Sequence, residues 1–370
     1  MSHRALRAAS HARASELAAL AVALNCTSAG AAVSVELDLS QAEKVLAVID
    51  AGTPGEEQLR QFRADPVTAA VISHGAKFDK RVTHSAWETG LTAAAAKQPV
   101  PQDPLRFEEV LARRSECAAL LARLRAEQFA VAARVGDALS AYAPAGENFT
   151  FRMHAVAGSN SSGWTSDDGK AFYFDVRAAG DDFEGAIALV THEIYHLVLA
   201  RLLPQPRLDA TSPSGQVERM LINGLDEGMA THVARFDDAG SGRLSRLNRR
   251  IASVNEIRAA ANFTLFGALL VAASRGEGVS AEDAALIAFS GAYDELGYYL
   301  FRDMIRVVEH ERGVPALMAL VRESPGSLVL AYHQIAQRTA SAAAGSVNPR
   351  LSAAALQAIA RIERERSAKR

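Results

Sequence analysis

The chain has 370 residues, of which 49% are hydrophobic and 22% charged, and its formal net charge is −2. This composition is typical of a globular protein with one large domain or two to three smaller ones. A nearly neutral chain has no basic field for a nucleic-acid backbone, so we expect no nucleic-acid partner. No apolar run reaches the roughly 18–20 residues that span a bilayer, and we expect no transmembrane segment. The two cysteines, Cys26 and Cys117, form neither a metal-binding pattern nor a disulfide framework.

The first 32 residues contain the three parts of a secretory signal in the usual order. The basic stretch MSHRALRAASHARAS precedes the short apolar run LAALAVAL at 17–24, and small residues follow at 27–32. We therefore predict a signal or targeting segment over 1–32 and an exported protein, periplasmic or secreted. The apolar run is short, however, and Glu16 lies at its edge. The alternative is a misassigned start or a frayed alanine-rich helix, and the protein would then be cytoplasmic.

Residues 33–147 are predicted to form an N-terminal helical region. After a brief extended stretch we expect a helix that begins near Ser40 and ends at Gly52. DPVTAAVISHGAKF and SAWETGLTAAAAKQ predict further short helices. The segment 103–143 is expected to be one long amphipathic helix, or two in sequence, because its apolar residues recur at helical spacing. These residues are Leu111, Ala118, Leu121, Leu124, Phe129, Ala132 and Val135.

The pattern changes after residue 147. FTFRMHAVAG at 149–158 alternates as a strand does, and AFYFDV at 171–176 is aromatic and β-prone. The loop between them, SNSSGWTSDDGK, is rich in turn residues. From about residue 214 to the end we expect helices only.

The stretch ALVTHEIYHLVLA, residues 188–200, contains three ionisable groups in an apolar helix. His192 and His196 are four residues apart, so both imidazoles lie on one helix face and can reach a single metal ion. Glu193 lies beside them, where it can accept a proton from water. This H-E-x-x-H arrangement is the zinc-binding and general-base pair of many metalloproteases, and we predict one Zn²⁺ ion. The alternative is two histidines that hydrogen-bond to neighbouring groups without a metal.

A catalytic zinc site generally has three protein ligands, so a further ligand is needed. Residues 199 and 202 are leucines, which excludes a third histidine shortly after the motif. We predict Glu227, 31 residues after His196, on a helix that begins near Ser214. Small or short side chains one turn away would let that helix approach the metal closely: Asn223, Gly224, Ala230 and Thr231. Asp226 and His232 are the rival candidates for the third ligand.

HEIYH followed by DEGMA resembles the gluzincin metallopeptidases, zincins whose third ligand is a glutamate on a second helix. The likeness is to uncharacterised bacterial zinc-dependent peptidases rather than to thermolysin or the large aminopeptidases. It implies an α+β, predominantly helical fold with a small sheet above the H-E-x-x-H helix. The catalytic region would span 148–310, between the N-terminal helical region and a C-terminal helical region at 311–370. A strand before the zinc helix would line the cleft, and 149–156 could pair with an extended peptide. His154 on that strand either faces the cleft or has a plain structural role.

Gluzincins often have a tyrosine on a later helix that stabilises the oxyanion. GAYDELGYYLFRDM, at 291–304, contains two candidates, Tyr293 and Tyr298. Tyr293 is one residue off the usual spacing to Gly297, and aromatic residues on a helix are more often part of the core.

The predicted activity is zinc-dependent hydrolysis of peptide bonds. Glu193 would activate zinc-bound water, which attacks the carbonyl carbon, and would then return the proton to the leaving amine. Two alternatives stay open. One is a catalytically degenerate zincin-like binding or structural protein, and the other is a zinc hydrolase that acts on a non-peptide amide. The expected partner is a peptide or protein substrate.

Overall fold

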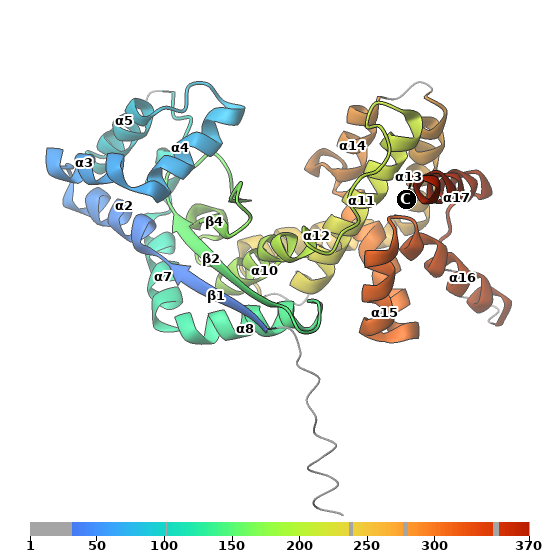
Figure 1. Ribbon diagram of the computed structural model, residues 1–370. Helices are drawn as coiled ribbons and strands as arrows, with labels where there is room; N and C mark the ends of the chain where they lie inside the picture. The colour runs from blue at the N-terminus through green and yellow to red at the C-terminus, as the bar shows by residue number, and fades with distance from the viewer. Residues whose placement is uncertain (1–31, 101, 237–239, 277–279, 343–347, 370) are drawn as a thin grey trace, which may run out of the picture.

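The computed structural model describes residues 32–100, 102–236, 240–276, 280–342 and 348–369 (Figure 1). The predicted signal segment therefore lies outside the described residues except for its last position. The elements up to the sheet's last strand and the turn after it are β1 (Ala32–Asp38), α2 (Ser40–Ala51), α3 (Glu56–Ala64), α4 (Pro66–Phe78), α5 (His84–Ala95), α6 (Phe107–Ala112), α7 (Arg114–Ala126), α8 (Gln128–Ser140), β2 (Asn148–Val156), β3 (Gly163–Thr165), β4 (Ala171–Asp175) and α9 (Val176–Ala179).

Helices follow as expected: α10 (Phe183–Leu199), α11 (Pro213–Ala234), α12 (Arg243–Ile257), α13 (Ala259–Arg275), α14 (Ala281–Phe289), the 3-10 turn η1 (Gly291–Tyr293), α15 (Leu296–Glu323), α16 (Ser327–Ala342) and α17 (Ala353–Ala368). The predicted helix-dominated α+β class is confirmed. No single described helix is long and apolar enough to cross a membrane. The pair α12 and α13, bent by 80°, meets that test of length and composition only when taken together.

The four strands form one mixed sheet in the order β1-β2-β4-β3. β2 pairs in parallel with both β1 and β4, and β3 pairs antiparallel with β4. The strands predicted at 149–158 and 171–176 are confirmed, with Phe149, Phe151 and Met153 buried on one face of β2. The prediction that 149–156 pairs with a peptide is wrong, because β1 and β4 occupy both of its edges. His154 is bound to Asp38 at 3.1 Å and stacks on Tyr173, so its neighbours belong to the sheet.

The helices surround the sheet unevenly. In Figure 1 the sheet and α2–α8 lie on one side, while α11 and α13–α17 gather on the other, with α10 and α12 between them. α10 contacts β2, β3 and β4 on one side and α11 on another. The helix that carries the H-E-x-x-H motif is thus held between the sheet and the C-terminal helices.

Residues 107–140 form three helices, so the prediction of one or two is wrong. The breaks fall at Arg113 (φ −108°, ψ 18°) and Glu127 (φ −106°, ψ 14°). The buried side chains nevertheless keep one helical spacing across the second break, since Leu124, Val131, Val135 and Leu139 are seven, four and four residues apart and Phe129 lies off that spacing. Phe129, predicted to be on the apolar face, is 83% exposed. α8 instead buries Val131, Val135 and Leu139.

Asp182 joins the start of α10 to the start of α12. Its side chain caps α10 by accepting a hydrogen bond from the Gly185 N–H at 3.0 Å. It also accepts hydrogen bonds from the Ser245 N–H at 2.7 Å and the Ser245 hydroxyl at 3.0 Å. A Cβ at Gly242 would come within 2.1 Å of the Asp182 carboxyl carbon, so the close approach of the two helices requires glycine. The N-terminus of the motif helix is therefore fixed in place.

α11 approaches α15 closely through two glycines. A Cβ at Gly224 would lie 2.1 Å from a ring carbon of Phe301, and one at Gly228 would lie 2.4 Å from the Phe301 Cβ. The small residues around Glu227 were expected to let the helix approach a metal. That explanation is wrong for Gly224, because the space is filled by Phe301.

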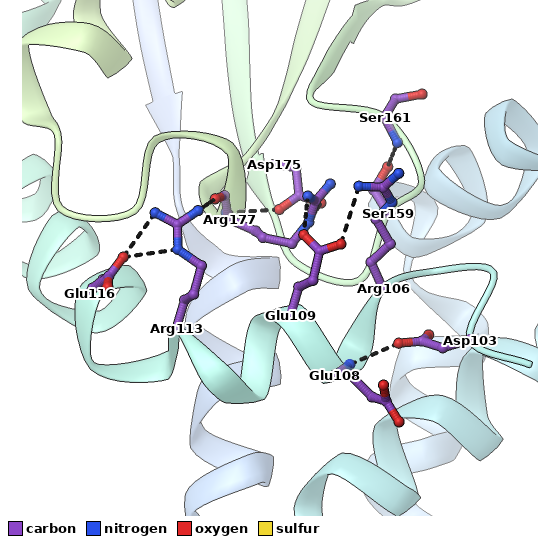
Figure 2. Close-up of polar contacts among 10 residues, drawn as sticks. All are labelled: Asp103, Arg106, Glu108, Glu109, Arg113, Glu116, Ser159, Ser161, Asp175 and Arg177. Carbon is purple, nitrogen blue, oxygen red and sulfur yellow. Dashed lines mark hydrogen bonds and ion pairs between the residues drawn. The ribbon is translucent and has the colours of Figure 1, made fainter. Parts of the chain in front are cut away.

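A buried ion pair closes the carboxyl end of β4 (Figure 2). Asp175 is 0% exposed and caps α9 by accepting a hydrogen bond from the Arg177 N–H at 2.9 Å. The Arg177 guanidinium donates to Glu109 at 2.8 Å, and its Nε lies 3.5 Å from the second Asp175 oxygen. Burial raises the pKa of Asp175 to about 6, because the loss of water outweighs the nearby positive charge.

The raised pKa predicts a pH-dependent stability for the wild type. An unfolded aspartate ionises near 3.8, so ionisation of folded Asp175 costs stability progressively as pH rises from about 4 to about 6. The cost levels off at about 3 kcal/mol or less above that range. Asp175→Asn keeps a capping oxygen and cannot ionise. Urea denaturation from pH 4 to pH 8 should therefore show the variant gaining stability relative to the wild type as pH rises. A difference that stays constant across this range would contradict the assignment.

Candidate metal centre

The two histidines of the motif point their Nε2 atoms at one position. They project from adjacent turns of α10, with rings at 85° and Nε2 atoms 3.2 Å apart. The His192 side chain is 8% exposed and the His196 side chain 18% exposed. Such a convergence of two imidazole nitrogens leaves at most one proton between them, and it suits a shared cation.

Glu227 completes the group from α11. Its Oε2 lies 3.5 Å from His192 Nε2 and 3.4 Å from His196 Nε2. A tetrahedral ion with ligand bonds of about 2.0–2.1 Å has ligand atoms about 3.3–3.4 Å apart, close to all three observed distances. His192, His196 and Glu227 are the one group of this kind among the described residues.

Two polar atoms of this group, His192 Nδ1 and Glu227 Oε2, are buried without a hydrogen bond to any described residue. Burial alone would raise the pKa of Glu227, but the two histidines hold it well below its usual range. A buried carboxylate oxygen without a hydrogen bond needs a cation nearby. The donor set therefore fits Zn²⁺, with two imidazoles and one carboxylate as ligands.

Asp226 orients one of the histidines instead of serving as the third ligand. Its Oδ1 accepts a hydrogen bond from His196 Nδ1 at 2.8 Å, which leaves the His196 Nε2 lone pair directed toward the metal position. Burial would lower the pKa of His196, but the charges of Asp226 and Glu227 outweigh it and raise that pKa well above the usual range. The two carboxylates therefore favour a positive charge at His196, which a proton or a metal ion would supply.

His232, the other rival, binds elsewhere. Its Nε2 contacts Glu309, and it lies 3.3 Å from the Tyr142 hydroxyl. The same hydroxyl donates to the Glu309 carboxylate at 3.1 Å. Burial lowers the pKa of His232 in spite of the neighbouring carboxylate. His232 thus belongs to a separate polar cluster, whose members lie on the loop between α8 and β2, on α11 and on α15.

The two tyrosines differ in position. Tyr298 lies in the first turn of α15, with its ring parallel to that of His192 and 6.2 Å away. Burial raises its pKa, and the charges of Glu227 and Glu295 raise it further. Tyr293 lies on η1 and is 50% exposed. The structure brings Tyr298, and not Tyr293, to the His192 side of the group.

Two glutamates flank the three converging side chains. Glu193 is partly exposed and forms no hydrogen bond or ion pair with any residue that the structure describes. Its charge nevertheless acts on Tyr298. Glu295, which the sequence did not single out, precedes α15 with a left-handed backbone (φ 55°), as does Asp294 (φ 55°). Burial raises the pKa of Glu295, although the charge of His192 lowers it. Two successive left-handed residues without glycine cost about 1–2 kcal/mol each, and sequence spacing gave no sign of them.

The hydrogen bond from His196 predicts that Asp226→Asn weakens metal binding. Losing the partner of a ligand histidine typically lowers metal affinity by roughly 10- to 100-fold. Competition with a chromophoric chelator would measure the Zn²⁺ affinity of each protein. Asp38→Asn is the matched control, since it removes the carboxylate partner of His154, a histidine of the sheet. Equal affinities for wild type and Asp226→Asn would show that the contact does not orient a ligand.

A comparison with known protein families is consistent with a metal site formed by these side chains. A family model described as "putative zinc dependent peptidase" (DUF5700) matches residues 77–341, which is more than two thirds of the chain. No curated protein and no solved structure matches the chain. The match extends on both sides of the 148–310 region and includes the three converging side chains of α10 and α11. The chain therefore belongs to the family of zinc-dependent peptidases described by that model.

Proposed function

We propose that this protein is a gluzincin-type metallopeptidase that hydrolyses peptide bonds with one Zn²⁺ ion held by His192, His196 and Glu227. The observation that carries the proposal is the triangle of three ligand atoms, 3.2–3.5 Å apart, beside an unbound Glu193. A purely structural zinc site is usually closed by four protein ligands, whereas this group has three. A set of only three protein ligands, with the Glu193 carboxylate beside it, favours a hydrolytic site over a structural one.

Bound Zn²⁺ would supply Lewis acidity toward a carbonyl oxygen and would lower the pKa of a water molecule. Glu193 then acts as general base, accepting a proton from the attacking water. It returns that proton to the leaving amine, so the carboxylate is regenerated when the peptide bond breaks. Asp226 keeps His196 in the tautomer that has its Nε2 lone pair free. Burial of the ligand side chains limits competing water.

Tyr298 is proposed to stabilise the oxyanion. Its phenol has a raised pKa and remains protonated at neutral pH, so it can donate a hydrogen bond to developing negative charge. The ring position beside His192 places the side chain at the metal-binding group. Tyr293 stays a candidate from the sequence, but its exposed position on η1 favours it less.

An extended substrate would bind along β3. This strand pairs with β4 on one side and, among the described residues, with no strand on the other. β3 also contacts α10, the helix of the two histidines. The Trp164 ring stacks on Tyr173 at 4.9 Å and on His74 at 4.5 Å, which holds the strand firmly. A rigid edge with free backbone groups is suited to pairing with an extended peptide.

Glu193→Gln should abolish most hydrolysis while zinc is retained. Loss of a general base typically lowers the rate by roughly 10²- to 10⁴-fold, and Glu193 is not among the three ligands. The test is zinc content by elemental analysis together with kcat/KM on a mixed fluorogenic peptide library. Glu184→Gln, a change on the same helix in its first turn, is the matched control and should keep full activity. Zinc-loaded wild type without peptidase activity would refute the proposed reaction.

Tyr298→Phe should lower kcat more than it raises KM. A lost oxyanion donor costs about 3–4 kcal/mol, or roughly 10²- to 10³-fold in kcat. Tyr293→Phe is the comparison, and we expect its kcat to match that of the wild type. Steady-state kinetics on a single cleaved peptide would measure both. If Tyr293→Phe is the slower variant, the assignment of the two tyrosines is reversed.

A further inference from the structure

A row of stacked rings crosses the face of the sheet opposite Met153. His154 of β2 stacks on Tyr173 of β4 at 5.1 Å, and Tyr173 stacks on Trp164 of β3 at 4.9 Å. These three residues are direct partners in the strand register. Their spacing is close to the distance between neighbouring strands, about 4.7–4.9 Å. The row therefore follows the strand order and advances by one strand with each ring.

The next ring of the row comes from a helix. His74 of α4 stacks on Trp164 at 4.5 Å, with the two planes 12° apart. His74 and Tyr173 both lie parallel to the indole and are not in ring contact with each other among the described residues, so they cover its opposite faces. β3 is the last strand of the described sheet. The His74 ring thus occupies the volume that a side chain of a further strand would take.

The His74 ring is fixed in this position. Three polar contacts join α4 to the segments before and after β3. They are His74 Nε2 with the Ser161 hydroxyl at 3.0 Å, the Asn160 amide with the Gly75 carbonyl at 3.3 Å, and Lys77 with Asp167 at 3.0 Å. The Trp164 indole that His74 covers is itself only 8% exposed. Turning the imidazole aside would break both its stacking and its hydrogen bond.

A peptide that pairs with β3 would place one residue directly opposite Trp164. Directly opposed residues of neighbouring strands extend on the same face of a sheet, with Cβ atoms about 4.5–5.5 Å apart. The side chain of that peptide residue would therefore point into the volume of the His74 ring. Glycine has no side chain there and alanine has only a methyl group. A larger side chain requires the ring to move.

We propose that His74 restricts the substrate residue opposite Trp164 to glycine or alanine. The restriction, which presupposes the proposed function, selects extended peptides with a small side chain at one fixed position relative to the scissile bond. It acts by exclusion, since a larger side chain would separate His74 from Trp164 and from Ser161. Only one position is restricted, because the adjacent residues of the peptide point to the other face of the sheet.

Substitutions within one cleaved peptide test the restriction on the zinc-loaded full chain. Each position near the scissile bond is varied in turn among glycine, alanine, leucine and phenylalanine, and kcat/KM is measured. At one position the wild type should cleave the glycine and alanine peptides at least tenfold faster than the leucine peptide. The expected ratio reflects the loss of both stacking and a hydrogen bond when the ring is displaced.

Two variants assign the discrimination to the imidazole. His74→Ala removes the ring and should lower the glycine-to-leucine ratio at that position at least tenfold. Ser161→Ala removes only the hydrogen bond that holds the ring, and it should lower the ratio roughly fivefold. His84→Ala is the matched control, because His84 is an exposed histidine at the start of α5, and its ratio should equal that of the wild type. Circular dichroism would verify that each variant is folded.

Peptide binding to zinc-loaded Glu193→Gln separates the restriction from peptidase activity. Fluorescence anisotropy should show the labelled glycine peptide binding at least tenfold more tightly than the leucine peptide, and adding His74→Ala should remove this difference. That result in a protein that cleaves no peptide would keep the restriction and refute the proposed reaction. Cleavage without a position that favours glycine or alanine would do the reverse.

Other results would also overturn the restriction. These are an unchanged glycine-to-leucine ratio in His74→Ala, an equal loss in His84→Ala, or a protein that neither cleaves nor binds any of the peptides. A preference that is lost in His74→Ala, reduced in Ser161→Ala and kept in His84→Ala supports it.

Discussion

The candidate metal-binding group depends on the contact between α10 and α11, which buries two imidazoles and a carboxylate within 3.5 Å of one another. Burying these groups without compensation would cost several kcal/mol, so a positive charge must accompany them. Without a metal, a proton on His196 would supply that charge, since Asp226 and Glu227 outweigh burial and raise the pKa of His196 well above its usual range. Zn²⁺ would replace this proton and satisfy all three atoms at once. The same electrostatic requirement thus links stability of the helix pair to metal binding.

The contact between α10 and α11 is fixed by packing at some distance from it. Asp182 caps α10 and also binds the start of α12, which prevents α10 from shifting along its axis. On the other side, Gly224 and Gly228 let Phe301 of α15 approach α11 closely. This second contact also places the first turn of α15, with Tyr298, beside His192. A geometry shared by three helices leaves little freedom for the ligand atoms.

The sequence predicted features set by local geometry better than features set by packing. Four-residue spacing on a helix determines that His192 and His196 share a face, whatever surrounds them. β2, β4 and the start of α2 were predictable from alternation and end signals for the same reason, whereas β3 lies in a segment expected to be a loop. Which strands lie at the edges of the sheet was not predictable. β1 lies over a hundred residues before β2, and neither strand contains a sequence pattern that indicates their pairing. The breaks at Arg113 and Glu127 fall in sequence without proline or glycine, so no local signal marked them.

Asp226 and Glu227 show why a motif can locate a site without assigning every role in it. Adjacent residues on a helix point about 100° apart, so both cannot face one ion. Glu227 reaches the Nε2 atoms of both histidines, while Asp226 reaches the Nδ1 on the other side of the His196 ring. Each carboxylate therefore meets a different nitrogen of the same imidazole. The sequence presented the two residues as rivals for one position, but the helix directs Glu227 to the Nε2 atoms and Asp226 to the far side of the His196 ring. An acidic pair on the second helix can thus both bind the ion and hold a histidine in the tautomer that binding requires.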